Sequence, residues 1–213
     1  GSPGSMTEED FKAALNFMAE ILDKNERAEE LINFFDKQKA ELKTGTKVSR
    51  SKSVYIGGIG NKGAQGITST EANYPPFKYL GLKNIIEAES KNNFTISKEK
   101  LLLDNPELIF IDQGGLKLVE KDLEREEFKY LAAYRNNNIY QLLPYNHYTT
   151  NFATMLADAY YIAQKIYPEE FKDLKPAEKA DQIYQKFVGE AVYSEMAEIF
   201  GGFKKMELNK NNR

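Results

Sequence analysis

Residues 96–112 read ISKEKLLLDNPELIFID, and no other stretch of this 213-residue chain says as much about its fold. Ser97 is a good N-cap for a helix over 98–104, because its hydroxyl can accept a hydrogen bond from a backbone N–H of the first turn. Asn105 and Pro106 end that helix, since proline does not continue it. The apolar run 108–112 then has the length and composition of a buried strand.

Strands and helices alternate on both sides of this segment. We expect further strands at 54–58, 84–88 and 139–143. Alternation of strands and helices from 54 to 166 predicts an α/β fold: a Rossmann-like lobe with a mostly parallel sheet flanked by helices. We place the helices before and after these strands at about 7–43, 117–134, 150–166, 176–188 and 190–199, with the last one closed by Gly201-Gly202, and residues 74–77 can start a further helix.

The ends of the chain set the expected domain organisation. Residues 1–6 read as an expression scar and start. The segment 7–43 shows helical spacing of apolar residues, an N-cap arrangement at Thr7 and Asp10, and a polar break at 23–25. We therefore expect a connecting helix region at 7–43, an α/β lobe with terminal helices at 44–203, and a frayed tail at 204–213.

Composition excludes several classes of site. The chain has no cysteine, so disulfides, thiolate metal sites and cysteine nucleophiles are excluded, and its single histidine, His147, excludes a multi-histidine zinc site within one chain. A net charge of -3 offers no overall field for nucleic acid, so we expect no nucleic-acid partner. No Ser-His-Asp arrangement can be assembled, and we expect no enzyme activity.

A glycine-rich loop follows the first strand. Gly58, Gly60 and Gly63 match the bare G-x-G-x-x-G spacing, but the sequence after Gly63, residues 64–70, is a poor helix start, and the fingerprint needs a helix there. Three interpretations stay open: a dinucleotide site in a nucleotide-binding α/β enzyme that uses the loop 57–66, a loop loosened by glycines, and a loop shaped to fit a bulky ligand.

A second unusual loop, residues 144–151, brings two phenols, an imidazole and several amides and hydroxyls into one turn. Tyrosine oxygens and a histidine nitrogen can ligate ferric iron, and aromatic rings can line a chelate pocket. The alternative is that Thr149 or Thr150 caps the next helix while the aromatic side chains pack locally. Ligands of parallel α/β sheets bind beyond the carboxyl ends of the strands. We therefore expect the turns that start at Gly57 and Pro144 to share one rim and to make half of a pocket.

The order of these segments resembles the periplasmic substrate-binding proteins that capture iron–siderophore complexes, haem or cobalamin for ABC importers. Three segments carry the resemblance: the helical region 11–42, the segment 96–110, and residues 145–151 with the helix that follows them. The resemblance implies the C-terminal lobe of a two-lobed, helical-backbone (class III type) protein, joined to its other lobe by a helix. No first lobe precedes Thr7, so we expect one wall of the cleft, and apolar surface on 11–42 and the last helices that drives self-association.

The resemblance also implies a function. The chain is expected to be a non-enzymatic carrier without an intrinsic cofactor, to bind a ferric chelate or haem, and to deliver it to a membrane ABC permease through Glu99. The native location would be periplasmic, or extracellular and lipid-anchored. A lobe without its own ligand, acting in protein interactions, is a further alternative. His147 and Tyr145 are the candidate metal ligands, and the expected ligand-binding residues are Asn61, Lys62, Gln65, Tyr145, His147, Tyr148 and Asn151.

Overall fold

The computed structural model describes residues 6–45, 52–60, 63–88, 93–147 and 149–208; the side chains of residues 147 and 149 are not described. Within these ranges the main sheet has the strand order β1-β4-β5-β8. β1 (Val54–Gly57), β4 (Leu108–Asp112) and β5 (Ile139–Leu142) are parallel, and β8 (Lys204–Lys205) is antiparallel to β5. The predicted α/β lobe with a mostly parallel sheet is confirmed.

The central strand β4 shows why the sheet is covered on both sides. Its residues are all buried. Leu108 and Phe110 belong to one apolar cluster, and Ile109 and Ile111 belong to another, because successive side chains of a strand point to opposite faces. Such a run needs helices on both faces.

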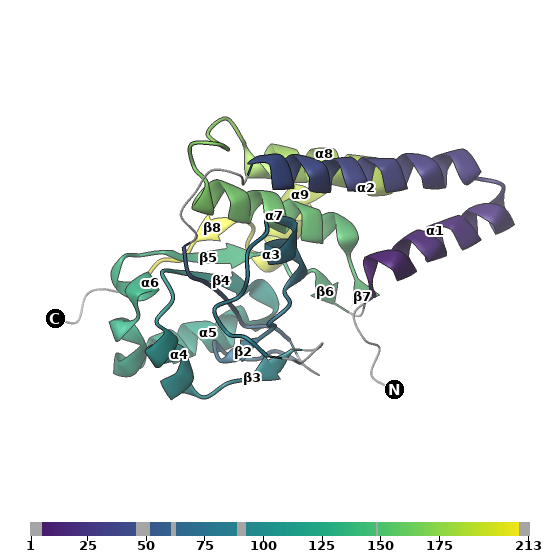
Figure 1. The fold of residues 1–213 in the computed structure, drawn as a ribbon. Helices are drawn as coiled ribbons and strands as arrows, with labels where there is room; N and C mark the ends of the chain where they lie inside the picture. The colour runs from purple at the N-terminus through teal and green to yellow at the C-terminus, as the bar shows by residue number, and fades with distance from the viewer. Residues whose placement is uncertain (1–5, 46–51, 61–62, 89–92, 148, 209–213) are drawn as a thin grey trace.

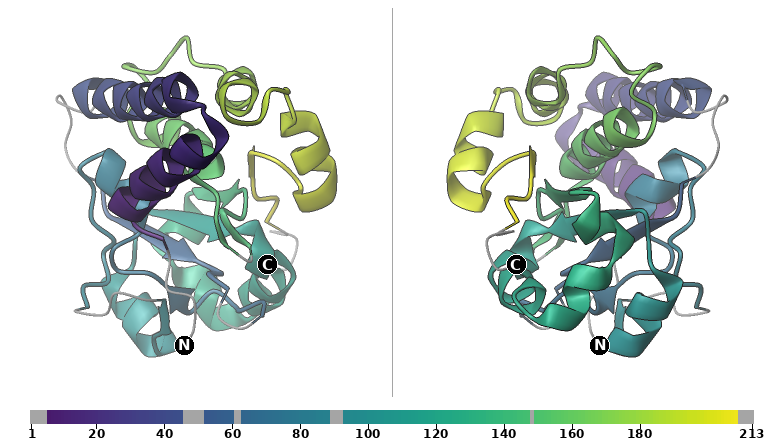
Figure 2. Two further views of the ribbon diagram at one scale, coloured as in Figure 1. Left: turned by 90° about the vertical axis from the view of Figure 1, so that its right-hand side faces the viewer. Right: turned by 90° about the vertical axis from the view of Figure 1, so that its left-hand side faces the viewer.

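Helices supply that cover (Figures 1 and 2). One face carries α2 (Asn25–Gly45), α3 (Pro75–Tyr79), α7 (Phe152–Ile166) and α8 (Pro176–Val188), and the other carries α4 (Lys98–Asp104), α5 (Leu116–Leu123) and α6 (Ala132–Arg135). The remaining described elements are α1 (Glu8–Leu22), α9 (Tyr193–Phe200), the short helices η1 (Gln113–Gly115) and η2 (Glu126–Tyr130), and two small hairpins, β2 (Ser69–Thr70) with β3 (Phe94–Thr95) and β6 (Asn146–His147) with β7 (Thr149–Thr150).

The segment 96–112 folds as predicted. The hydroxyl of Ser97 accepts a hydrogen bond from the backbone N–H of Lys100, 3.1 Å long, at the start of α4. Asn105 ends the helix in the left-handed conformation, with a φ of 46°. Its side-chain oxygen accepts a 2.7 Å hydrogen bond from the N–H of Ala132, so this turn also anchors the start of α6.

The connecting region 7–43 is not one helix. It folds as a hairpin of α1 and α2, which turns back at Asp23, a residue with a φ of 52° (Figure 1). Thr7 and Asp10 form the expected capping box. Phe11 stacks on Phe152 of α7 with 4.2 Å between ring centroids, so the first half of α1 is attached to the lobe. The polar break at 23–25 was visible in sequence, but the reversal of direction was not.

Three further expectations were wrong. Residues 84–88 form a single parallel bridge from Asn84 to Val54 instead of a strand, and the Asn84 amide holds the neighbouring loop. The expected helix 117–134 is three short pieces, α5, η2 and α6, because the chain is extended at Arg125, with a ψ of 138°, and at Leu131, with a ψ of 135°. The tail is not frayed from its start: β8 pairs with β5, and Met206 is buried.

No helix in the described ranges is both long enough and apolar enough to span a membrane.

Candidate functional site

Loops leave the carboxyl ends of β1, β4 and β5 at one rim of the sheet. The three strands are parallel and adjacent, with Gly57 paired to Ile111 and Asp112 paired to Leu142. The loops that start at Gly57 and Pro144 therefore emerge on the same rim, as the sequence predicted. We call the described parts of segments 58–73, 112–116 and 143–151 the rim loops.

The first two rim loops touch through glycines. A Cβ placed on Gly115 would lie 2.3 Å from the backbone oxygen of Gln65 and 2.4 Å from that of Gly58. Only glycine allows this approach. At Gly66 a Cβ would lie 2.2 Å from a carboxylate oxygen of Asp122, which accepts a 3.0 Å hydrogen bond from the N–H of Ile67. The loop is thus held by α5 and by the turn after β4.

The first and third rim loops are joined by buried side chains. The phenol of Tyr145 donates a 2.8 Å hydrogen bond to Oε2 of Glu71, and both residues are buried. Asn84 donates to the hydroxyl of Thr70 (2.8 Å) and to the backbone oxygen of Glu71 (3.0 Å), which fixes the end of the first loop. The buried carboxylate of Glu71 needs the hydrogen bond from Tyr145, because burying a carboxylate without a partner is costly.

Two further buried carboxylates, Asp112 and Asp158, lie at the rim. Asp112 accepts a 2.7 Å hydrogen bond from the N–H of Gly114, and Asp158 of α7 accepts a 3.2 Å one from the N–H of Leu143. Burial raises the pKa of Asp112 to about 7 and the pKa of Asp158 well above its usual range. Burial also raises the pKa of Glu71, although the hydrogen bond from Tyr145 opposes that shift.

The buried rim retains unused hydrogen-bonding capacity. The hydroxyl of Tyr74 and Oδ2 of Asp158 have no hydrogen-bond partner among the described residues. Tyr74 lies against Tyr145, with 5.7 Å between ring centroids at an interplanar angle of 63°. Burial raises the pKa of the Tyr74 phenol well above its usual value, and the neighbouring acidic groups, Asp158 foremost, add to that shift, so its hydroxyl stays a donor.

The structure distributes the predicted ligand-binding residues unevenly. Tyr145 is directed at Glu71, and Asn151 caps α7, with its side-chain oxygen accepting a 3.0 Å hydrogen bond from the N–H of Thr154. The cap of this helix is therefore Asn151, not Thr149 or Thr150. Gln65 is half-buried beside Gly115. Gln65, Tyr145 and Asn151 therefore come from two rim loops at the same edge of the sheet. Asn61, Lys62, Tyr148 and the side chain of His147 lie outside what the structure describes.

Direct metal binding by Tyr145 and His147 stays a prediction. His147 belongs to β6, but its side chain is not described. Among the described residues no group of three or more histidine, aspartate or glutamate side chains is arranged to hold a metal ion. The polar groups that the rim does bring together are carboxylates and phenols, at Glu71, Tyr74, Asp112, Tyr145 and Asp158.

Glu99, the expected docking residue, is exposed in the first turn of α4. The helix begins just after Ile96, whose N–H donates a 3.0 Å hydrogen bond to the backbone oxygen of Thr68 in the first rim loop. Glu99 therefore belongs to the same end of the lobe as the rim loops. An acidic residue in the first turn is also favoured by the helix dipole, and the two roles are compatible.

The glycine loop does not lead into a helix. Residues after Gly63 pass through a turn at 67–68 into β2. The dinucleotide fingerprint places the phosphates at a helix N-terminus that directly follows the glycines. In this chain the glycines lead into β2 and not into a helix N-terminus. The glycines instead allow close packing of the rim loops.

Comparisons with known proteins bear on the family. The family model described as "Periplasmic binding protein" matches residues 3–145, well over half of the chain. The chain belongs to the periplasmic binding protein family. No curated protein matches it. The alternation of strands and helices and the segment 96–110 therefore pointed to the right family.

Solved structures of other periplasmic binding proteins share the fold. Molybdate-bound MolA of Haemophilus influenzae is 19% identical, with a TM-score of 0.67, over 84% of this chain and 56% of that one. An ABC-type Fe3+-hydroxamate transport system protein of Saccharomonospora viridis is 19% identical, with a TM-score of 0.58, over 78% and 58%. Helicobacter pylori CeuE in a Ni-His complex is 20% identical, with a TM-score of 0.64, over 92% and 62%. This chain thus spans less than two thirds of the length of each.

Sequence reasoning missed most of the buried rim in this periplasmic binding protein. Asp112 is the last residue of the strongest strand, and that position was a usable signal, because the carboxyl end of a parallel strand lies at the rim. Glu71 and Asp158 gave no such signal. Glu71 lies in a polar stretch, Asp158 lies in an apolar helical stretch, and only the folded arrangement brings them to Tyr145 and Leu143.

Proposed function

We propose that this chain is the ligand-binding C-terminal lobe of a substrate-binding protein that serves an ABC importer. The observation that carries the proposal is the single rim built by three loops, in a chain of the periplasmic binding protein family. Parallel α/β sheets bind ligands at this edge. In this proposal the α1–α2 hairpin corresponds to the connecting helix region, and 44–203 corresponds to the lobe.

The ligand in this proposal is a metal chelate, either a ferric chelate or haem. The loop 144–151 supports it, because phenols and an imidazole there suit ferric iron and its planar or aromatic chelators. The Fe3+-hydroxamate transport protein of Saccharomonospora viridis also favours this class, whereas MolA binds molybdate. Gln65, Asn151 and the undescribed Asn61, Lys62 and Tyr148 complete the proposed ligand-binding set.

Delivery to a membrane permease is the second half of the proposal. Exposed Glu99, beside the rim, is the proposed contact with basic residues of the permease. The protein would then work in the periplasm, or outside the cell on a lipid anchor.

The test is a titration of the chain with ferric desferrioxamine B, haemin and molybdate, followed by quenching of tyrosine fluorescence, since the chain has 13 tyrosines and no tryptophan. We expect saturable binding of an iron compound and at least roughly tenfold weaker binding by the double variant Tyr145→Phe/His147→Ala. Tyr130→Phe, at an exposed tyrosine of η2, is the matched control and is expected to bind like the parent. Equal affinity of the double variant and the control would contradict the site, and saturable binding of molybdate alone would contradict the ligand class.

A further inference from the structure

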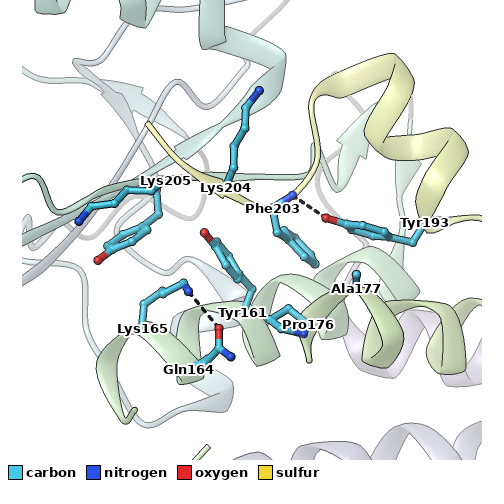
Figure 3. A pocket seen from close by; sticks show the side chains of 10 residues that line it. Tyr161, Gln164, Lys165, Pro176, Ala177, Tyr193, Phe203, Lys204 and Lys205 are labelled. Carbon is cyan, nitrogen blue, oxygen red and sulfur yellow. Dashed lines mark hydrogen bonds between the residues drawn. The ribbon is translucent and has the colours of Figure 1, made fainter. Parts of the chain in front are cut away.

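A pocket lies where β5, β8, α7 and the C-terminal segment meet (Figure 3). Its volume is about 550 Å3. The side chains that matter here are Tyr140, Tyr161, Lys165, Tyr193, Phe203 and Lys205.

The pocket lies at the β5–β8 side of the sheet, and its C-terminal segment touches the rim: the side-chain amide of Gln113 donates a 2.7 Å hydrogen bond to the backbone oxygen of Gly202. α7 starts at the rim after its N-cap Asn151 and runs back along β5: Asp158, in its middle, meets Leu143, and Tyr161 lies 6.3 Å from Tyr140 between ring centroids. Lys165 is in the last turn of α7. The described residues that line this pocket include none of the rim loops, so the pocket is a different surface from the rim.

One wall of the pocket is aromatic. Tyr161 and Phe203 stack with 4.7 Å between ring centroids and 10° between planes, and Tyr193 lies 5.2 Å from Phe203. The hydroxyl of Tyr193 accepts a 2.7 Å hydrogen bond from the N–H of Phe203, which holds the C-terminal segment against α9 (Figure 3). Rings fixed in this way offer a ready surface for a flat apolar group.

The other wall carries two positive charges. The ammonium of Lys165 lies 4.8 Å from the ring centroid of Tyr161 and 5.8 Å from that of Tyr140, and the ammonium of Lys205 also lies 5.8 Å from Tyr140. Burial, together with the charge of Lys205, lowers the pKa of Lys165. Lys165 donates a 3.0 Å hydrogen bond to the side-chain oxygen of Gln164 (Figure 3), which leaves its charge uncompensated.

A neighbouring lysine shows what a compensated site looks like. Lys179 also lies over a tyrosine, 4.3 Å from the ring centroid of Tyr160, and it pairs with the carboxylate of Glu41 at 3.6 Å. Neither Lys165 nor Lys205 has an ion pair with any carboxylate of the described residues. Two positive charges near one ring attract an anion. Pairing with an anion stabilises a half-buried ammonium more than an exposed one.

We propose that this pocket binds a small aromatic carboxylate, with the carboxylate between Lys165 and Lys205 and the ring against Tyr161 and Phe203. The charges select an anion, and the aromatic wall selects a ring over a small inorganic ion. This site is separate from the rim and from the proposed chelate.

The experiment is calorimetric titration of the chain with 2-naphthoate, alongside 2-naphthol as the uncharged analogue and inorganic phosphate as the anion without a ring. We expect 2-naphthoate to bind at least about tenfold more tightly than either analogue. Lys165→Gln/Lys205→Gln is expected to lose about tenfold or more in affinity, while Lys179→Gln, the matched control at a compensated lysine, stays within about twofold.

Folding of each variant is checked by circular dichroism, and backbone amide NMR shifts of the parent locate the bound probe. Shifts at 203–206 and at the end of α7 support the proposal. Unchanged affinity of the double lysine variant, phosphate binding as tightly as 2-naphthoate, or shifts confined to the rim loops would each overturn it.

Discussion

Glu71 and Tyr145 are 74 residues apart in sequence, and the phenol of Tyr145 donates a 2.8 Å hydrogen bond to the Glu71 carboxylate in the interior. This contact joins the loop after β1 to the loop after β5. The turn after β4 meets the first loop at Gly115. The three loops therefore form one connected edge, and a change in one of them reaches the others.

Tyr145→Phe removes the donor and leaves the buried carboxylate of Glu71 without it. A buried acceptor that loses its partner costs about 1–3 kcal/mol. We expect the free energy of unfolding in urea to fall by that amount, and the midpoint to fall with an unchanged slope. Tyr130→Phe, at a tyrosine that is 73% exposed, is expected to leave the midpoint in place. Equal midpoints for the two variants would show that the hydrogen bond does not support the rim.

Asp112→Asn tests the buried acid. The pKa of Asp112 is raised from 3.8 to about 7, so between these values the folded state holds a proton that the unfolded chain releases. Stability then falls as pH rises from about 4 to about 7, by up to about 4 kcal/mol, because the unfolded state binds fewer protons. The variant removes this loss, and its advantage over the parent is expected to grow from pH 5 to pH 8 in urea unfolding curves.

The matched control is Asp173→Asn at an exposed aspartate. Its unfolding free energy is expected to follow the parent at both pH values. A constant difference between Asp112→Asn and the parent from pH 5 to pH 8 would contradict the raised pKa.

Gly115→Ala tests the close approach of the rim loops. The added methyl group would meet backbone oxygens of Gln65 and Gly58, which cannot move away as a side chain can. Overpacking of this kind costs about 1–3 kcal/mol. Thermal unfolding is the measurement. Gly60→Ala is the control, since among the described residues its Cβ would meet nothing closer than 3.3 Å. A melting temperature of Gly115→Ala at or above that of Gly60→Ala would argue against the packing described here.

The expected self-association can be tested at the outer half of α1, where apolar side chains are exposed. Phe17 is 63% exposed and Ile21 is 61% exposed, and Met18 and Leu22 are exposed beside them. Apolar surface of this kind drives association. We expect sedimentation velocity at raised protein concentration to show dimers or larger species, and Phe17→Ser/Ile21→Ser to shift the chain towards monomer. Leu103→Ser, at an exposed leucine of α4, is the control. Monomer at every concentration would refute self-association.

Much of the fold was readable from local sequence signals. The segment 96–112 carries its own cap, helix stop and buried strand, and each signal acts over a few residues, so the prediction at Ser97, Asn105 and Leu108 was correct. The helix at 176–188 was likewise set by Pro176 at its start and Gly189 at its end.

The failures share a different cause. Residues 84–88 have the composition of a strand, but Asn84 is bound to Thr70 and Glu71 of another loop, and no local pattern reports that. β8 forms because Lys204 and Lys205 pair with β5, more than 60 residues earlier in the chain. The buried acids of the rim likewise depend on contacts between distant segments. For the same reason the sequence predicted the loops of the site but few of its buried groups.

Amide NMR shift mapping with the gallium complex of desferrioxamine B, a diamagnetic stand-in for the ferric chelate, tests the central claim most directly. It reports binding even at roughly millimolar affinity. We expect shifts at the rim loops, in Ile59, Glu71, Gly114 and Asn146, with little change at β8 and α9. Shifts confined to β8 and α9, or none at any concentration, would contradict the assignment of the rim as a chelate-binding edge.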